Sequence, residues 1–400
     1  MSELALKLSP EELLQVDEFG ELRQRARRAL MQHGFPDLKT EEWKYTSLRV
    51  LQQREFQAAS ASASQLPGLP FDACVLHFDN GVLDPDSVEL IDGIALEPAG
   101  PDDLGDVSYG GREDAFAWLN LANFSQAWKL RISGEPSRPL VLAFSSADDF
   151  SAAVHPRLLI ELADNARATI VEIHSGNGEG MTNSVANMKL GQGAGLSHVF
   201  RCSDHQAIRV GRTRVDVGRD AEYRAYILDS GARLGRQDLQ VFLNAAGAQT
   251  ELDGTVLLDT RQHVDYHTAV DHCTGHTESR EMFRYLADGA GVGVFNGRIH
   301  IHEDADDSHS DMSIASLLLG PMARINAKPE LEIYSEEVTA GHGATIGQLD
   351  EDALFYLRSR GMTDEDANAL LKYGFASAPL ENMADEAVRK WLLDELRQAL

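Results

Sequence analysis

The sequence predicts a mainly β fold, a parallel β-helix (solenoid) with helical regions at both ends. From about residue 70 to 345, short β-rich runs such as Leu158–Leu162 and Thr169–Ile173 alternate with turn residues. Before and after this stretch, apolar residues recur at helical spacing. The third observation is a repeat inside the β-rich region.

Small residues follow short polar turns at a nearly constant spacing in this region. Four alanines are separated by 28, 27 and 27 residues, namely Ala166, Ala194, Ala221 and Ala248. His263 and Ala290 are again 27 residues apart. Such a period indicates a solenoid, because each coil buries its apolar side only by stacking on the next coil. A β-sandwich with regular loops is the alternative.

The N-terminal region, residues 1–57, is predicted to be helical. Ser9 and Glu12 form a possible capping box, and Gly34 interrupts the helical pattern before a short helix that begins at Thr40. Small polar residues predict a linker over 58–70, followed by the β-helix core, 71–349. One helix, Ala115–Leu121, is expected inside the core.

The C-terminal region, residues 350–400, is predicted to contain three helices. Acidic residues from Asp350 begin the first helix, and Gly361 is placed for its C-terminal cap. Thr363 begins a second helix that ends near Gly374, and the last helix carries Trp391.

Charge and cysteine usage limit the function classes. The chain has 63 acidic and 36 basic residues and a formal net charge of −27, which opposes binding to nucleic acid or to an anionic membrane surface. Cys74, Cys202 and Cys273 are too far apart in sequence for a metal knuckle and suggest reduced thiols. We therefore expect a cytoplasmic protein, since no secretory leader or membrane-spanning run is recognisable.

Histidines gather in two places that could bind a metal ion. His263, His267 and His272 belong to one segment. In a strand we expect their spacings of four and five to place them on different faces, so we interpret them as polar residues within the coils of a solenoid and not as a metal site. His300 and His302 share one face of a strand. With no third ligand nearby, we expect them to be solvent-facing.

Signatures of nucleophilic catalysis and of phosphate binding are missing from the sequence. The most informative stretch runs from Lys328 to Gly361 and contains His342 between two glycines. From the residues alone, His342 belongs to a turn that ends a strand pair. No catalytic residue is predicted.

Four ordered segments resemble the SufB/SufD family of the SUF iron–sulfur cluster assembly system. They are Gly34–Thr46, Asp271–Arg280, Gly293–Ile299 and Lys328–Gly361, and the similarity extends to about residue 383. The resemblance implies a right-handed β-helix and a scaffold subunit without enzymatic activity. It also implies a complex with a SufB-type paralogue and a SufC-type ABC ATPase.

The resemblance also assigns roles to residues. His342 matches a histidine proposed to help hold a nascent cluster at the partner interface, and the C-terminal helices match the ATPase-docking surface. The candidate contacts are Tyr356, Leu357, Arg358 and Tyr373. Family members of the SufB type carry a cysteine that would fall near Ile314, so the chain is of the SufD type. Ala340 stands where many relatives have a second cysteine.

These implications leave alternatives open. The isolated chain is expected to hold no cofactor stably, an iron–sulfur cluster would be transient in the complex, and flavin binding is undetermined. A homodimer acting outside the full complex is one alternative. A β-helix enzyme acting on carbohydrate is another, although the two helical regions disfavour it.

Overall fold

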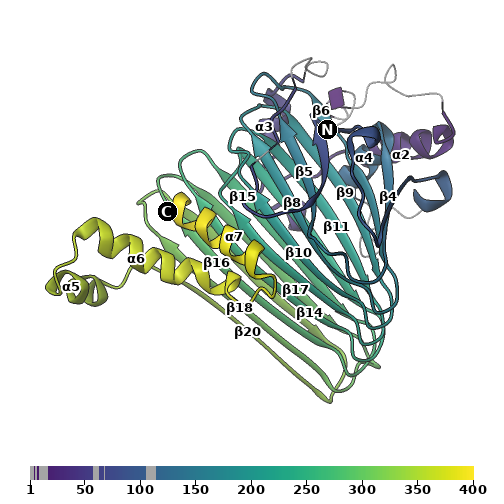
Figure 1. The fold of residues 1–400 in the computed structure, drawn as a ribbon. Helices are drawn as coiled ribbons and strands as arrows, with labels where there is room; N and C mark the ends of the chain where they lie inside the picture. Colours follow the sequence, from purple (N-terminus) through teal and green to yellow (C-terminus); the bar gives the residue numbers. More distant parts are fainter. Residues whose placement is uncertain (1–3, 5–6, 9–16, 57–62, 67, 105–113) are drawn as a thin grey trace.

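The computed structural model describes residues 4, 7–8, 17–56, 63–66, 68–104 and 114–400. Two ten-stranded sheets face each other and form a flattened solenoid in which the chain alternates between them (Figure 1). We call them sheet A and sheet B. Sheet A contains, in spatial order, β2 (Val82–Leu83), β1 (Cys74–Asp79), β5 (Leu140–Ser146), β8 (Arg167–Gly176), β10 (Gly195–Cys202), β12 (Glu222–Asp229), β14 (Gln249–Leu258), β16 (Glu278–Ala287), β18 (Ser308–Leu318) and β20 (Val338–Gly347).

Sheet B follows the same direction through the solenoid. It contains β3 (Ile94–Pro98), β4 (Ala127–Ile132), β7 (Arg157–Leu162), β9 (Met181–Leu190), β11 (Ile208–Val217), β13 (Leu234–Leu243), β15 (His263–His272), β17 (Val292–Ile301) and β19 (Arg324–Ile333), with β6 (Ala153–Val154) paired to β9. From β5 and β7 onward every strand pairing in the described chain is parallel, which confirms the predicted parallel solenoid.

The alanine repeat marks one corner of the solenoid. Ala166, Ala194, Ala221 and Ala248 each come directly before a strand of sheet A, and each is at most 1% exposed. The amide of Glu222 donates to the carbonyl of Ala194, and the amide of Gln249 donates to that of Ala221. Only a small side chain fits between coils stacked this closely, so the repeat follows from the stacking itself.

The fourth repeat pair, His263 with Ala290, does not occupy equivalent positions, so its inclusion in the repeat was wrong. His263 pairs with Val292 in sheet B, 29 residues on, and Ala290 lies two residues before that partner. In sheet A the spacing also lengthens, because Gln249 pairs with Glu278 and Glu278 pairs with His309. The constant period therefore holds only for the middle coils.

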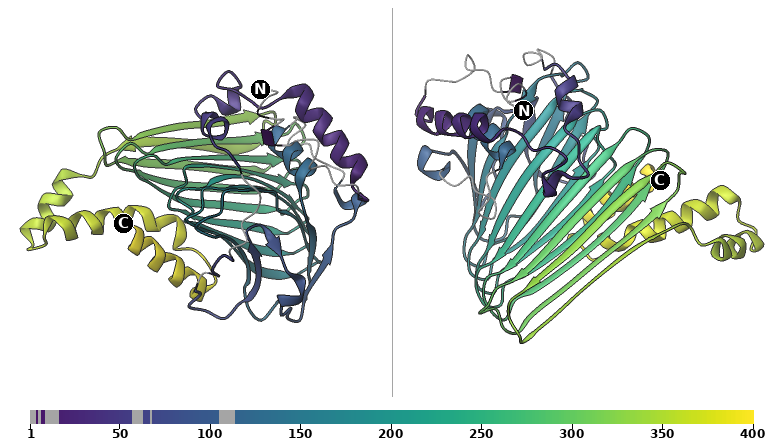
Figure 2. Two further views of the ribbon diagram at one scale, coloured as in Figure 1. Left: turned by 90° about the horizontal axis from the view of Figure 1, so that it is seen from above. Right: turned by 180° about the vertical axis from the view of Figure 1, so that it is seen from behind.

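Helices cover the outer faces of the two sheets. On the sheet B side lie α2 (Gly20–His33), α3 (Arg49–Gln53) and α4 (Ala115–Asn123), with a short 3-10 helix, η2 (Glu41–Trp43) (Figure 2). On the sheet A side lie the end of α6 (Asp364–Ser377), η5 (Ala378–Leu380) and α7 (Glu386–Ala399). The connections near β2 and β3 contain η3 (Pro85–Ser87) and η4 (Pro101–Leu104).

The N-terminal motif fixes its segment to sheet B. Trp43 stacks on Phe116 with ring centroids 5.2 Å apart, and the guanidinium of Arg236 lies 4.0 Å from the Trp43 ring. The hydroxyl of Thr46 donates to Asp265 over 2.5 Å. The proposed capping box, Ser9 with Glu12, and residues 58–62 and 67 of the proposed linker lie outside the described residues.

The predicted helix signals of the C-terminal region are confirmed. The carboxylate of Asp350 caps α5 (Glu351–Ser359), Thr363 caps α6, and Gly361 adopts a φ of 94° between them. However, α6 continues through Gly374 to Ser377. Among the described residues, no helix is both long and apolar enough to cross a membrane.

We predict that Ala221→Leu destabilises the solenoid by about 1–3 kcal/mol, because the corner has no room for three further carbons. Thermal unfolding of the full chain should show a lower midpoint. The matched control is Ala369→Leu, since Ala369 is exposed on α6 and should tolerate the change. Equal midpoints for the two variants would contradict the close-packed corner.

Candidate functional site

His342 lies in the middle of β20, so its assignment to a turn was wrong. It pairs with Met312 of β18, whose side chain is 1% exposed in the solenoid core. Paired residues of parallel strands point to the same face, so His342 faces the inner side of sheet A. The turn prediction failed because two glycines in a β-rich segment also suit an edge strand.

The coil that contains His342 is the last one. β20 ends the order of sheet A and β19 ends that of sheet B, so among the described residues neither strand has a neighbour on its far side. His342 is exposed although it points inward. A side chain added at Gly343, which points to the opposite face of β20, would also meet no atom within 4 Å, so that face of the strand is uncovered here as well. The last coil therefore presents its inner face to solvent, and we call this surface the open end.

Apolar side chains accompany His342 at the open end. Ile333 is 40% exposed and Ile346 is 52% exposed. The backbone groups of an edge strand are also free to pair with another chain. An uncovered edge with apolar side chains is typical of a protein–protein interface.

Polar groups lie directly beneath the open end. His342 of β20 pairs with Met312 of β18, and Met312 pairs with Glu281 of β16. Glu281 therefore lies two strands away from the edge of sheet A. Thr268 donates a 2.5 Å hydrogen bond to Glu281, and the second oxygen of that carboxyl has no partner. Burial raises the pKa of Glu281 to about 7, although the bond from Thr268 acts in the opposite direction.

A second buried network runs beside Glu281. His272 contacts the hydroxyl of Thr277 over 2.7 Å and that of Ser279 over 2.9 Å, and Ser279 in turn contacts Ser310 over 2.7 Å. Burial lowers the pKa of His272 to about 4, so the imidazole is neutral. Ala340 pairs with Ser310 and places no thiol above this network.

The predicted ATPase-docking residues lie on two different surfaces. No residue of α5 is buried, and α5 projects away from both sheets (Figures 1 and 2). Tyr356 is 56% exposed and Arg358 forms a surface ion pair with Asp364 over 3.0 Å. Leu357 is half-buried. Tyr373 instead packs near α7, where the guanidinium of Arg397 lies 4.8 Å from its ring.

The first histidine group is a structural cluster. His263 and His267 share a face with Asp265, because residues two and four apart in a strand point the same way. We expected the three histidines to lie on different faces of the strand. This was wrong for His263 and His267, which share a face, and right for His272, which lies on the other face. Nε2 of His267 lies 3.0 Å from Asp265, and Nε2 of His263 lies 3.0 Å from the hydroxyl of Thr46. These contacts hold the N-terminal segment.

The second histidine group gains a third member from a neighbouring strand. Asp271 pairs with His300, and His302 lies on the same side. The expectation that no third ligand lies nearby was therefore wrong, whereas both imidazoles are partly exposed on the outer face of the sheet. Asp271 is 29 residues from His300, and only the strand register could have revealed the contact.

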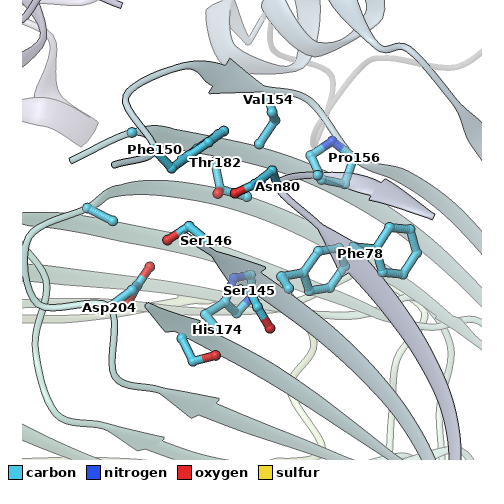
Figure 3. Close-up of a pocket in the computed structure, with 15 residues that line it drawn as sticks. Phe78, Asn80, Ser145, Ser146, Phe150, Val154, Pro156, His174, Thr182 and Asp204 are labelled. Atoms are coloured by element: carbon cyan, nitrogen blue, oxygen red, sulfur yellow. The ribbon is translucent and has the colours of Figure 1, made fainter. Parts of the chain in front are cut away.

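A pocket lies elsewhere, near the first coils (Figure 3). Its lining includes Phe78, Asn80, His174 and Asp204. The side-chain oxygen of Asn80 accepts from the amide of Ala147, and His174 is 2.7 Å from Glu172. These polar groups serve internal contacts, and the pocket includes none of the residues predicted to function.

These features define a class of protein: a parallel β-solenoid with an uncovered last coil and a C-terminal helix, α5, that has no buried residue. Residues 143–375 match the family model described as "SUF system FeS cluster assembly, SufBD core domain". The chain therefore belongs to the SufBD family of iron–sulfur cluster assembly proteins.

Its similarity is to the SufD members of that family. The chain is 26% identical to "Iron-sulfur cluster assembly protein SufD" of Escherichia coli, an alignment that covers 93% of this chain and 90% of the relative. It is 29% identical to a SufBD family iron–sulfur cluster assembly protein of Synechocystis, over 90% and 86% of the two chains. It is 25% identical to the chloroplastic protein ABCI7 of Arabidopsis thaliana, over 92% and 83%.

We predict that Glu281 makes folding stability depend on pH. Its carboxyl has a pKa of about 7 when folded against 4.5 as the ordinary value, so the native state retains a proton that the unfolded chain releases. The contribution of this proton to the free energy of unfolding is on the order of 3 kcal/mol. It is fully present below pH 4.5 and is lost as the pH rises to about 7. Glu281→Gln should flatten this part of the profile. An unchanged slope between pH 5 and 7.5 in denaturant unfolding would contradict the assignment.

Proposed function

We propose that the chain is a non-catalytic scaffold subunit for iron–sulfur cluster assembly, joined to a SufB-type paralogue through the open end. The observation that carries the proposal is that His342 lies on the inner face of the last coil and is exposed, with no described part of the chain covering it. A second β-solenoid docked on β19 and β20 would pair the free edges and bury Ile333 and Ile346.

The proposed role of His342 is to hold iron of a nascent cluster, which is the cargo of the complex. Neutral imidazole is a suitable iron ligand, and thiolate from the partner would complete the site. Because Ala340 supplies no thiolate, the chain offers an imidazole at this place without a neighbouring cysteine. One imidazole cannot hold a cluster alone, so the isolated chain would carry little iron.

The proposed docking surface for a SufC-type ABC ATPase is the hairpin of α5 and α6. Phe355, 68% exposed, and Tyr356 give α5 an apolar patch, and Arg358 gives it a positive charge within an acidic chain. Large aromatic and arginine side chains are typical centres of protein interfaces. Tyr373 is proposed to position the hairpin against α7 through its contact with Arg397.

A homodimer through the same open end is the alternative when the paralogue is absent. The edges of β19 and β20 offer backbone groups to any parallel or antiparallel partner. Co-expression with the paralogue should replace such a homodimer, and the mass of each purified complex distinguishes the two assemblies.

We predict that His342→Ala leaves assembly of the co-expressed three-subunit complex and its ATP hydrolysis intact but lowers iron and sulfide several-fold. The matched control is His309→Ala, since His309 is exposed on the outer face of neighbouring β18. Iron and sulfide analysis of the purified complexes checks this. Normal loading of the His342→Ala complex would remove this residue from the mechanism.

We predict that Tyr356→Ala combined with Arg358→Ala weakens ATPase capture at least tenfold, which corresponds to about 1.4 kcal/mol. Lys390→Ala, on the exposed side of α7, is the control. Removal of the whole C-terminal region is a poorer test, because Leu392 and Leu396 of α7 are fully buried against sheet A. Equal capture by the double variant and the control would place the ATPase elsewhere.

A further inference from the structure

The outer face of sheet B carries a group of three potential metal ligands. Asp271 of β15 and His300 of β17 are paired neighbours, and His302 follows two residues later. One ligand atom from each lies within 4.8 Å of the other two. Nδ1 of His300 is 3.0 Å from Oδ1 of Asp271, and Nε2 of His302 is 3.6 Å from the same oxygen.

The three side chains are arranged before any ion binds. Asp271 is 4% exposed, so its carboxylate is largely removed from water. Nε2 of His302 is buried and has no hydrogen-bond partner. The two imidazole rings lie 4.1 Å apart, and the ring of Tyr334 packs edge-on against His300. A cation placed among these atoms would satisfy the unpaired nitrogen and bring the carboxylate a second favourable contact.

We propose that Asp271, His300 and His302 bind one divalent transition-metal ion of the Zn²⁺ or Fe²⁺ type. Two imidazoles and one carboxylate suit these ions, with the remaining positions open to water. The alkaline-earth ions are disfavoured because they prefer sites made only of oxygen ligands.

Arg298 limits the affinity of this site. Its Nη2 lies 3.2 Å and 3.4 Å from the two oxygens of Asp271, and its Nη1 lies 3.3 Å from Glu332. The guanidinium orients the carboxylate, while its positive charge opposes a metal ion. Glu332 offsets part of that charge. Removal of the guanidinium charge in Arg298→Gln should therefore strengthen binding of the ion.

The site is separate from the open end. His342 faces the inner side of sheet A, whereas these residues lie on the outside of sheet B. The inference therefore does not depend on the proposed function.

The test is calorimetric titration of the metal-free full chain with Zn²⁺ near pH 7.5. Wild type should bind one equivalent, and the His300→Ala, His302→Ala double variant should bind at least tenfold more weakly. His309→Ala should match wild type. Absence of binding by wild type, or unchanged binding by the double variant, would overturn the proposal.

A second measurement keeps the test valid if the double variant folds poorly. The side chain of His302 is 43% exposed, so His302→Ala alone should fold normally. Zn²⁺ should raise the thermal midpoint of wild type and raise that of His302→Ala much less. Equal rises in the two proteins would overturn the proposal.

Discussion

Each coil of this protein depends on the next one to bury its inner face, and the rest of the structure follows from that constraint. In the middle coils, the core residues of sheet A and sheet B are covered on both sides, as for Ala225 and Val241, both fully buried. Within the part of the chain that the structure describes, the final coil has a neighbouring coil on one side only. Its inner face, with His342, therefore remains open to solvent, and a β-solenoid of this kind is incomplete until something docks there.

The interior is not purely apolar, and two of its carboxyl groups show how the surroundings decide a charge. Glu172 and Glu281 are both deeply buried. For Glu172, burial alone would raise the pKa, but hydrogen bonds from His174 and His198 outweigh it and hold the value at about 2. Glu281 has only the hydroxyl of Thr268, so burial prevails and its pKa is about 7. The charged carboxylate, Glu172, lies on β8 far from the open end, and the neutral carboxyl, Glu281, lies near it.

The sequence predicted what depends on local chemistry and repetition. The alanine corner, the caps of α5 and α6 at Asp350 and Thr363, and the parallel stacking could all be inferred from residue types at short or periodic spacings. The contact of Asp271 with His300 could not, because it depends on which residues of β15 and β17 face each other. That register changes as the coils lengthen from 27 to 31 residues in sheet A. His342 was placed in a turn for a different reason, because two glycines do not distinguish a turn from an edge strand.

The central claim is that the open end is the surface on which the SufB-type partner docks. Hydrogen–deuterium exchange of the chain, alone and in the co-expressed complex, tests it most directly. The account predicts that amides of β20, from Val338 to Gly347, exchange rapidly in the isolated monomer and become protected in the complex. Protection confined to other strands, with exchange in β20 unchanged by the partner, would contradict it.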